Sequence, residues 1–224
     1  FDYNLPNIPL SISNLDSIKY IDFDDSGILA LPDSFSELQN LETLWLGRNP
    51  LNHFPNSIYS LSNLILLGLY SLYITDSEHL IISSEIENLS NLKYLSLHGT
   101  QLQGYIPPEI GNLINLTDLN LSNNQLIGDI PSSLGSLYNL IDLDLSNNQL
   151  TGDIPPELGN LTSLESFILT DNQISGIPDE LGNLSNAAIS LRDNFITEIP
   201  CNCSVASMDL SFNLISEINI DIGD

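Results

Sequence analysis

Basic residues are scarce in this chain. Lysine and arginine together number 4, against 29 aspartates and glutamates, so the 224-residue chain carries a formal net charge of −25 at pH 7. A surface of this charge repels nucleic acids and anionic membranes, which excludes both as direct partners, and it attracts cations and basic proteins. The acidity also fits a chain that needs high solubility or works in salty surroundings, and this alternative says nothing about a partner.

Long apolar runs are missing too. No stretch approaches the roughly 18 uninterrupted apolar residues that a membrane-spanning helix needs. The first ten residues, FDYNLPNIPL, lack the basic and then apolar layout of a secretion signal, so we expect any targeting segment to have been removed or never to have been present. With 42% hydrophobic residues, the chain can still bury a substantial core in one elongated domain, residues 1–224.

Cysteine is limited to Cys201 and Cys203, which one residue separates. A disulfide between them would close a very short, strained ring, so we expect both to be buried as small apolar residues, with an intermolecular bridge as the alternative. Catalytic motifs are absent as well: the chain has no HExxH, no GxSxG and no glycine-rich phosphate loop. The protein is therefore predicted not to be an enzyme.

The chain does contain a leucine repeat. Residues 113–136 and 137–159 read LINLTDLNLSNNQLIGDIPSSLGS and LYNLIDLDLSNNQLTGDIPPELG, the same phrase at a spacing of 24. A fixed period of this length predicts a solenoid of stacked coils, a fold that usually binds other macromolecules. Aligning the position of the consensus Asn gives nine coils, with spacings of 23, 23, 28, 24, 24, 24, 22 and 19 residues. The aligned residues are Ser26, Asn49, Leu72, Thr100, Asn124, Asn148, Asn172, Asn194 and Asn213.

Each coil is predicted to contain one short strand, as at 119–121 and 143–145. Side chains alternate along a strand, so the leucines point inward, the intervening residues point outward, and one parallel sheet lines one side of the solenoid. The Asn that follows each strand is expected to satisfy backbone groups of adjoining turns that water does not reach. Leu72 interrupts this ladder, and Ser26 and Thr100 replace the Asn only in part.

The pattern LxxLxxLxLxxNxLxGxIPxxLGNL resembles the plant-type leucine-rich repeat of receptor-kinase ectodomains and polygalacturonase-inhibiting proteins. The resemblance covers nearly the whole chain and is closest from Leu89 to Leu184. It implies an α/β-type repeat solenoid, a right-handed superhelix of about nine coils with one parallel β-sheet on the concave face and a mostly irregular or 3-10 convex side. It also implies a second short strand at LxGxIP, and ligands bound along the concave or lateral surface. The residues that carry it are Leu113, Leu116, Leu119, Leu121, Asn124, Leu126, Gly128, Ile130, Pro131 and Leu134.

The two ends depart from that family, because the paired-cysteine caps are missing. Residues 1–14 are expected to be the end of a preceding coil, with a minimal cap as the alternative, and the repeats occupy residues 15–218. Open solenoid ends expose core leucines, so a fragment of a longer protein or docking by partner subunits is expected. The 28-residue coil holds an irregular insertion at 72–84, which we expect to loop out as a secondary contact site while its apolar residues 80–82 pack on the body.

The outward-pointing strand positions form the expected recognition surface. In the first four coils they carry aromatic side chains, and rigid Tyr and Trp rings serve as binding anchors because they lose little entropy on contact. The alternative is that some of these rings pack on one another as neighbours across strands. The positions in the first four coils are Tyr20, Asp22, Trp45, Arg48, Tyr70, Tyr94 and His98. The later coils turn acidic, with Asp118, Asn120, Asp142, Asp144, Asp171, Asp193 and Asp209.

Two of these carboxylates occupy one column of successive coils. Asp118 and Asp142 should lie about 5 Å apart, the spacing of neighbouring strands, and like charges this close repel unless a cation or basic ligand sits between them. With Asp144 on the same face, three oxygen donors could converge on Ca²⁺, and a solvated acidic face is the alternative. No other cofactor is expected, because His53, His79 and His98 are scattered over three coils.

The repeat phrases also generate six N-x-S/T sequons, which are candidate glycosylation sites in a protein secreted by a eukaryote. Glycans at Asn88, Asn160 or Asn183 would lie away from the strand face, whereas a glycan at Asn120 would obstruct it. The remaining sequons begin at Asn115 and Asn202.

Three classes of function follow. The first is a non-catalytic extracellular or cell-surface module that recognises a protein, peptide or glycan through the concave strand face. The second is a structural subunit of a surface layer or filament that docks through its solenoid ends. The third is an acidic intracellular binder of basic proteins, similar to acidic leucine-rich chaperones of histones. Ice binding would need a flat array of regularly spaced Thr, which the exposed columns do not provide.

Overall fold

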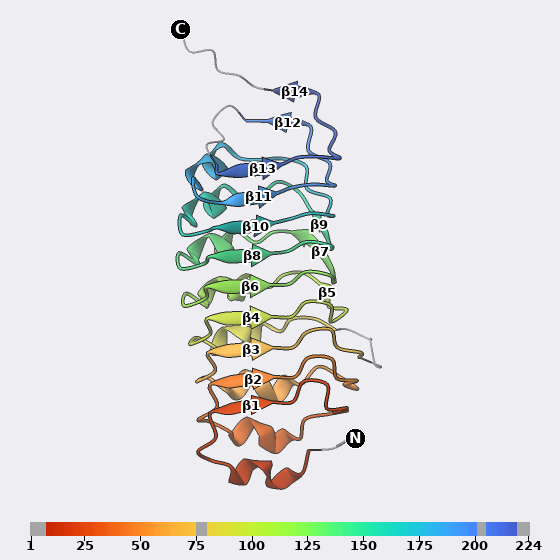
Figure 1. The fold of residues 1–224 in the computed structure, drawn as a ribbon, viewed down its shortest axis with the longest axis vertical. Coiled ribbons are helices and arrows are strands. Elements are labelled where there is room, and N and C mark those ends of the chain that lie inside the picture. Colours follow the sequence, from red (N-terminus) through yellow and green to blue (C-terminus); the bar gives the residue numbers. More distant parts are fainter. Residues whose placement is uncertain (1–7, 75–79, 201–204, 219–224) are drawn as a thin grey trace.

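The computed structural model describes residues 8–74, 80–200 and 205–218. Stacked coils run from the N-terminal to the C-terminal end of the molecule, and each coil adds one strand to a nine-stranded parallel sheet (Figure 1). Neighbouring strands pair without stagger, as where Leu95 of one faces Leu119 of the next. The nine predicted coils and their parallel sheet are therefore confirmed. The strands are β1 (Tyr20–Asp22), β2 (Thr43–Trp45), β3 (Leu66–Gly68), β4 (Tyr94–Ser96), β6 (Asp118–Asn120), β8 (Asp142–Asp144), β10 (Ser166–Ile168), β11 (Ala188–Ser190) and β13 (Ser207–Asp209).

The opposite side of the solenoid consists of short 3-10 helices, and every helical segment in the described part of the chain is of this kind. Most begin after a proline, whose fixed φ suits the first turn. Consecutive helices pack closely where glycine faces the next coil: a Cβ on Gly135 would lie 2.4 Å from the backbone oxygen of Glu157. The helices are η1 (Leu10–Asn14), η2 (Asp33–Glu37), η3 (Asn56–Ser60), η4 (Ser84–Asn88), η5 (Pro108–Asn112), η6 (Ser132–Ser136), η7 (Pro156–Asn160) and η8 (Asp179–Asn183).

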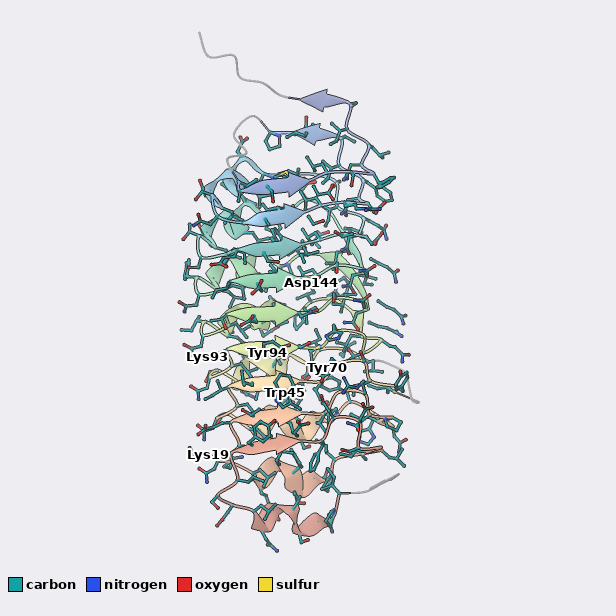
Figure 2. The ribbon with its side chains drawn as sticks, viewed as in Figure 1. Lys19, Trp45, Tyr70, Lys93, Tyr94 and Asp144 are labelled. Carbon is teal, nitrogen blue, oxygen red and sulfur yellow. The ribbon has the colours of Figure 1, made fainter. Side chains whose placement is uncertain are left out.

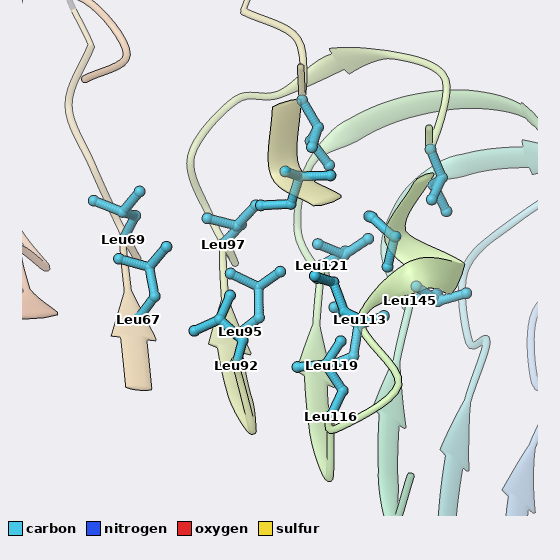
Figure 3. Close-up of a cluster of buried hydrophobic side chains, with 14 of the residues drawn as sticks. Leu67, Leu69, Leu92, Leu95, Leu97, Leu113, Leu116, Leu119, Leu121 and Leu145 are labelled. Carbon is cyan, nitrogen blue, oxygen red and sulfur yellow. The ribbon is translucent and has the colours of Figure 1, made fainter. Parts of the chain in front are cut away.

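The core is a continuous column of leucines between the sheet and the 3-10 helices. Leu67, Leu95 and Leu119 hold the same place in successive coils, and all three are buried (Figure 3). Removing a side chain of this kind would leave a cavity and cost about 2–5 kcal/mol. The leucine periodicity of the sequence therefore places the inward face correctly.

An asparagine ladder connects six of the nine coils to the coil before them. The Asn124 amide nitrogen donates to the carbonyl oxygens of Leu97 and Leu121 at 2.9 and 3.0 Å, and its oxygen accepts from the backbone N–H of Leu102 at 3.0 Å. Asn49, Asn148, Asn172, Asn194 and Asn213 make equivalent bonds. At the ladder position of the third coil, Leu72 is buried and has no side-chain amide, so the predicted break is present.

A second, smaller sheet runs beside the ladder in the regular coils. It pairs β5 (Gln103–Gly104), β7 (Gln125–Asp129) and β9 (Gln149–Thr151) in parallel, and a further bridge joins Asp153 to Gly176. Gly104, Gly128 and Gly152 have φ values of 74°, 76° and 73°, which favour glycine over residues with a Cβ. This sheet confirms the second strand that the family resemblance implied. Near the C-terminal end, β12 (Glu198–Ile199) pairs with β14 (Glu217–Ile218).

The apolar part of the insertion packs on the body, as expected. Leu80 and Ile82 are buried, Ile81 is 54% exposed, and the Leu80 carbonyl oxygen accepts a hydrogen bond from the backbone N–H of Gln103 at 2.6 Å. The rest of the predicted loop, residues 75–79 with His79, lies outside the described residues, as do Cys201, Asn202, Cys203 and both chain ends. Within the described ranges, no helix has the length and apolarity required to cross a membrane.

Candidate functional site

Four rings gather on the outward surface of the main sheet. We call this surface the strand face; in each coil it comprises the first and third residues of the strand and the residue two positions beyond the strand's end. Trp45 ends β2 and Tyr94 begins β4, while Tyr70 and His98 follow β3 and β4 by two residues. Trp45, Tyr70 and Tyr94 lie close together over the neighbouring coils of β2, β3 and β4 (Figure 2). We call Trp45, Tyr70, Tyr94 and His98 the aromatic platform.

The rings of the platform touch in an unbroken series. The Trp45 ring centroid lies 5.5 Å from that of Tyr94 and 6.3 Å from that of Tyr70, the latter in an edge-to-face arrangement at 70°. Tyr70 and His98 stack at 5.2 Å with 10° between their planes. The alternative that these rings pack on one another is thus correct. Each ring is only partly buried, so packing fixes the rings and leaves area exposed on the strand face.

Two glycines create the space that the platform occupies. A Cβ on Gly68 would lie 2.2 Å from Cε3 of Trp45, because the indole extends across the third position of β3. A Cβ on Gly47 would lie 2.4 Å from the Tyr70 ring, which extends in the opposite direction over the preceding coil. The Trp45 and Tyr70 rings therefore extend over neighbouring coils in opposite directions, and a side chain at either glycine would displace them.

Polar contacts hold one edge of the platform. The Tyr70 hydroxyl donates a hydrogen bond to the Asp24 carboxylate, whose other oxygen accepts from the backbone N–H of Gly47 at 2.6 Å. The Arg48 guanidinium carbon lies 5.6 Å from the Tyr70 ring centroid, and its Nε donates to Asp25 at 2.8 Å. Burial raises the pKa of the Tyr70 hydroxyl, and the bond to Asp24 raises it further. The hydroxyl thus stays protonated and anchors the ring at neutral pH.

His98 closes the other edge of the platform. Its Nδ1 lies 2.8 Å from the hydroxyl oxygen of Ser96, a residue that is fully buried. Burial lowers the pKa of the His98 imidazole, and the charge of Asp144 opposes this shift in part. The ring is therefore neutral at pH 7 and adds flat area to the platform without adding positive charge.

Tyr20 and Asp22 are on the same face but apart from the platform. The Tyr20 side chain is 58% exposed, and its hydroxyl donates to Asp22 at 3.3 Å. None of the ring contacts among the described residues joins Tyr20 to the platform. The structure thus brings four of the predicted aromatic side chains together and leaves Tyr20 separate.

The acidic part of the strand face begins next to Tyr94. Asp118 of β6 pairs in register with Asp142 of β8, and Asp144 of β8 pairs with Asn120. A hollow of about 220 Å³ lies here. The pKa of the Asp142 carboxyl is raised by partial burial first and then by the charges of Asp118 and Glu165. The lining residues are Tyr94, Asp118, Leu119, Asn120, Asp142, Leu143, Asp144, Ser166 and Ile168.

The predicted calcium site gains no support from this arrangement. Within the described ranges, no group of three or more His, Cys, Asp or Glu side chains is placed to hold a metal ion. One Asp144 oxygen already accepts two bonds from Ser146, at 3.0 Å from its N–H and 2.6 Å from its hydroxyl. Calcium binding by Asp118, Asp142 and Asp144 stays a prediction.

Of the other predicted acidic positions, Asp209 lies on the strand face as the last residue of β13. Hydrogen bonds from the Ser211 hydroxyl and N–H hold the pKa of the Asp209 carboxyl below its ordinary value. Asp171 and Asp193 instead occupy turns after the strands, with φ values of 56° and 54°. These two carboxylates therefore extend the acidity beyond the strand face.

Five sequons lie in the described part of the chain. Asn88, Asn160 and Asn183 end η4, η7 and η8 and are exposed away from the strand face, as expected. Asn115 is exposed beside the sheet, where its amide donates to the Ser90 carbonyl oxygen at 2.9 Å. Asn120 ends β6 on the strand face and is half-buried. Their occupancy stays a prediction.

Another hollow, of about 450 Å³, lies beside the strand face and not on it. Exposed asparagines form most of its wall, and their amides donate to carbonyl oxygens of the preceding coil, as Asn63 does to Gln39 at 2.7 Å. These donors are occupied by the fold itself, so the chemistry favours the strand face as the candidate site. The lining residues are Asn40, Glu42, Asn63, Ile65, Asn91, Lys93 and Asn115.

Sequence reasoning did not identify Asp24, Gly47, Gly68 or Ser96 as parts of the site. Each occupies an outward strand-face position of its coil. The available signal was the pair of glycines at outward positions directly beside outward Tyr and Trp in adjacent coils. Comparing coils side by side, and not each coil alone, would have shown that these positions make room for rings.

Comparison with known proteins agrees with this geometry. A model of the leucine-rich repeat region matches residues 69–193, and a leucine-rich-repeat model matches residues 40–61. The chain is similar to the Arabidopsis receptor kinase HAESA, solved with the peptide hormone IDA and a co-receptor: identity is 32%, the TM-score is 0.83, and the match covers 92% of this chain and 36% of that one.

Two further structures are similar. The ectodomain of the Arabidopsis receptor kinase GASSHO1/SCHENGEN3, in complex with CASPARIAN STRIP INTEGRITY FACTOR 2, is 30% identical with a TM-score of 0.77, covering 94% of this chain and 29% of that one. A leucine-rich-repeat protein of Leptospira interrogans is 34% identical with a TM-score of 0.73, covering 94% and 47%. This chain thus spans less than half of each of the three proteins. No curated protein sequence gives a significant match. Because the repeat-region match covers more than half of its residues, the chain belongs to the leucine-rich-repeat family, with repeats of the plant type.

Proposed function

We propose that this chain is a non-catalytic recognition module, extracellular or at the cell surface, that binds a protein or peptide through its strand face. The observation that carries the proposal is the aromatic platform, in which crossed rings are fixed by Gly47, Gly68 and Asp24 before any ligand arrives. The similar structure of the receptor kinase HAESA, solved with a bound peptide hormone, supports it.

Preorganisation favours binding here. A ring that already rests against its neighbours loses little conformational entropy when a ligand covers it, so more of the contact energy appears as affinity. Trp and Tyr are also the side chains most enriched among residues that dominate binding energy. The Trp45 and Tyr94 rings, in contact at 5.5 Å, are therefore the expected anchor.

The test is affinity capture from the surface and secreted fraction of the source organism, comparing the native chain with the Trp45→Ala/Tyr94→Ala variant. We expect the native chain to retain a protein or peptide that the variant loses. Tyr105→Ala/Tyr138→Ala is the matched control, because these rings are 68% and 60% exposed and lie outside the strand face. Thermal unfolding of each variant checks that the fold is kept.

The other outcomes separate the alternatives. Retention of the same partner by the platform variant would overturn binding through the strand face. Capture of further copies of this chain alone would favour assembly through the solenoid ends, measured as concentration-dependent mass by light scattering. A carbohydrate eluted from the native chain and absent from the platform variant would keep the surface and change the ligand from protein to glycan.

A further inference from the structure

The platform is bordered by carboxylates on both sides along the solenoid. Asp22 and Asp24 lie on the N-terminal side, and Asp118, Asp142 and Asp144 lie on the C-terminal side. This arrangement places an uncharged, aromatic surface between two negatively charged ones. A ligand that covers the strand face must therefore bring positive charge or leave carboxylates facing one another without compensation.

Beside Asp118, Asp142 and Asp144, the basic residues of the chain do not provide that charge, whereas on the N-terminal side Arg48 lies 3.9 Å from Asp24. Lys19 pairs with Glu42 at 2.6 Å, Arg48 with Asp25 at 2.8 Å, and Arg192 with Asp193 at 2.9 Å. Lys93 lies just before β4, on the same edge of the sheet as Lys19, which lies just before β1. Asp144 lies away from this edge (Figure 2). None of the ion pairs within the described ranges involves Asp118, Asp142 or Asp144.

The hollow beside Tyr94 suits one basic side chain. Its volume is about 220 Å³, and its lining includes Tyr94 and the register partners Asp118 and Asp142. A guanidinium can bond two carboxylates with its fork of donors and lie flat on a tyrosine ring, which an ammonium does less well. Burial raises the pKa of Asp142 first, and the charges of Asp118 and Glu165 raise it further; such a cation would relieve this repulsion.

Strand spacing sets the distance between the two contacts. The Trp45 ring covers β3, and the hollow lies between β6 and β8, about two and a half strand spacings or 12 Å away. An extended peptide crossing the strands covers about 13 Å in four residues, which is close to this separation. Side chains four positions apart in an extended peptide point to the same side, so both can face the strand surface at once.

We propose that the ligand is an extended basic peptide segment, with an apolar or aromatic side chain on the Trp45–Tyr70 rings and an arginine four positions away in the hollow of Asp118 and Asp142. This inference rests on the proposed function and adds the charge and spacing of the ligand. Charge complementarity selects the occupant, since the strand face offers carboxylates and rings and no unpaired cation in the hollow.

The test is a selection of random displayed peptides, about ten residues long, against the full chain. We expect enriched peptides to carry arginine four positions from an aromatic or apolar residue. Their Kd should weaken about tenfold on Asp118→Asn/Asp142→Asn, which keeps side-chain shape and removes two charges. The matched variant Asp129→Asn/Asp153→Asn removes the same charge from the second sheet, away from the strand face, and should change Kd less than about twofold.

Two results would overturn the basic ligand. One is a set of enriched peptides without basic preference, and the other is an equal loss of affinity in the two charge variants. The Trp45→Ala/Tyr94→Ala variant separates this failure from failure of the proposed function. Peptides that need the rings but ignore Asp118 and Asp142 would keep strand-face recognition and reject the basic ligand. Peptides whose affinity is unchanged by both the ring variant and the charge variant would contradict strand-face recognition and the basic ligand alike.

Discussion

The coils up to β4 and the coils from β6 onward share one sheet but differ in how closely they follow the repeat. From Thr100 on, each coil connects to the next through an asparagine amide, and Gly104, Gly128 and Gly152 support the second sheet. The earlier coils lack that sheet in the described residues, and Leu72 interrupts their ladder. The earlier coils nevertheless contain the aromatic platform.

The difference indicates a division of roles. In the regular coils the strand-face residues are mostly small or acidic, with Ile168 and Arg192 as exceptions. These coils gain repeated hydrogen bonds between neighbours. The irregular coils give up part of that bonding, and their strand face holds large rings over Gly47 and Gly68. Stability is thus expected to concentrate in the later coils, and aromatic recognition in the earlier ones. Four substitutions test this division.

The largest effect is expected where the ladder is buried, at Asn172→Ala. The amide of Asn172 bonds the carbonyl oxygens of Leu145 and Leu169 and the N–H of Leu150, at 3.0, 3.1 and 3.0 Å. The substitution leaves the buried Leu150 N–H without a partner, while the carbonyl oxygens of Leu145 and Leu169 keep the amides of Asn148 and Asn194 and each lose one hydrogen bond. The free energy of unfolding should fall by about 4 kcal/mol, with about 2 kcal/mol from the unpaired N–H and about 1 kcal/mol from each lost bond. Denaturant unfolding measures it. Asn139→Ala removes a single exposed bond and should cost about 1 kcal/mol; equal losses would contradict a stabilising ladder.

Close packing of the regular coils is tested next, by Gly135→Ala. The added Cβ would lie 2.4 Å from the backbone oxygen of Glu157 in the following coil, and backbone cannot rotate away. Consecutive coils must separate, so we expect a loss of about 3 kcal/mol in unfolding free energy, at the upper end for overpacking. Ligand binding at the platform should be unchanged in the folded variant. A loss below about 0.5 kcal/mol would show that neighbouring 3-10 helices can shift apart at little cost, which would contradict the stabilising role of close packing in these coils.

Gly68→Ala, in the irregular coils, should lower stability only slightly but disrupt the aromatic platform. Its Cβ would lie 2.2 Å from the Trp45 ring, a surface side chain that can swing away, so the stability loss should be about 1 kcal/mol. The platform should nevertheless come apart. Trp45 is the single tryptophan of the chain, so its fluorescence should shift to longer wavelength and become more accessible to a neutral quencher. An unchanged emission spectrum would mean that Gly68 does not position the ring.

Sequence alone predicted those parts of the fold that repeat. The leucine period located the nine strands, and the consensus Asn located the ladder, including its interruption at Leu72. Both succeed because one residue type does one physical task in every coil. The second sheet came from the family resemblance, since two-residue strands such as Gln103–Gly104 leave too short a pattern to read.

The sequence predicted which aromatic residues lie on the strand face, but not how their rings are arranged. Outward alternation placed Trp45, Tyr70 and Tyr94 on one face correctly. Which way each ring leans depends on the neighbouring coil, some 23 residues away in sequence, where Gly68 or Gly47 leaves room. Tyr20, which meets no such glycine contact, stayed separate although its sequence pattern looked equivalent. Contacts between coils, unlike those within one, are not encoded in a local window.

The smallest effect is expected for Asp142→Asn, which tests whether carboxylates on the strand face differ in their effect on stability from carboxylates elsewhere on the regular coils. Because the folded protein raises the pKa of Asp142 above its ordinary 3.8, the stability linked to its protonation is present below that value and is lost as pH rises through the raised pKa. Asp142→Asn should therefore stabilise the protein at pH 7 by about 0.5 kcal/mol, the scale of a like-charge pair across strands, or about 1–2 °C in Tm. The gain should vanish as pH falls below the raised pKa of Asp142, where the Asp142 carboxyl is protonated and carries no charge. Asp129→Asn changes net charge equally on the second sheet, and if it gave the same gain over the same pH range, the stabilisation would come from net charge and not from the facing pair.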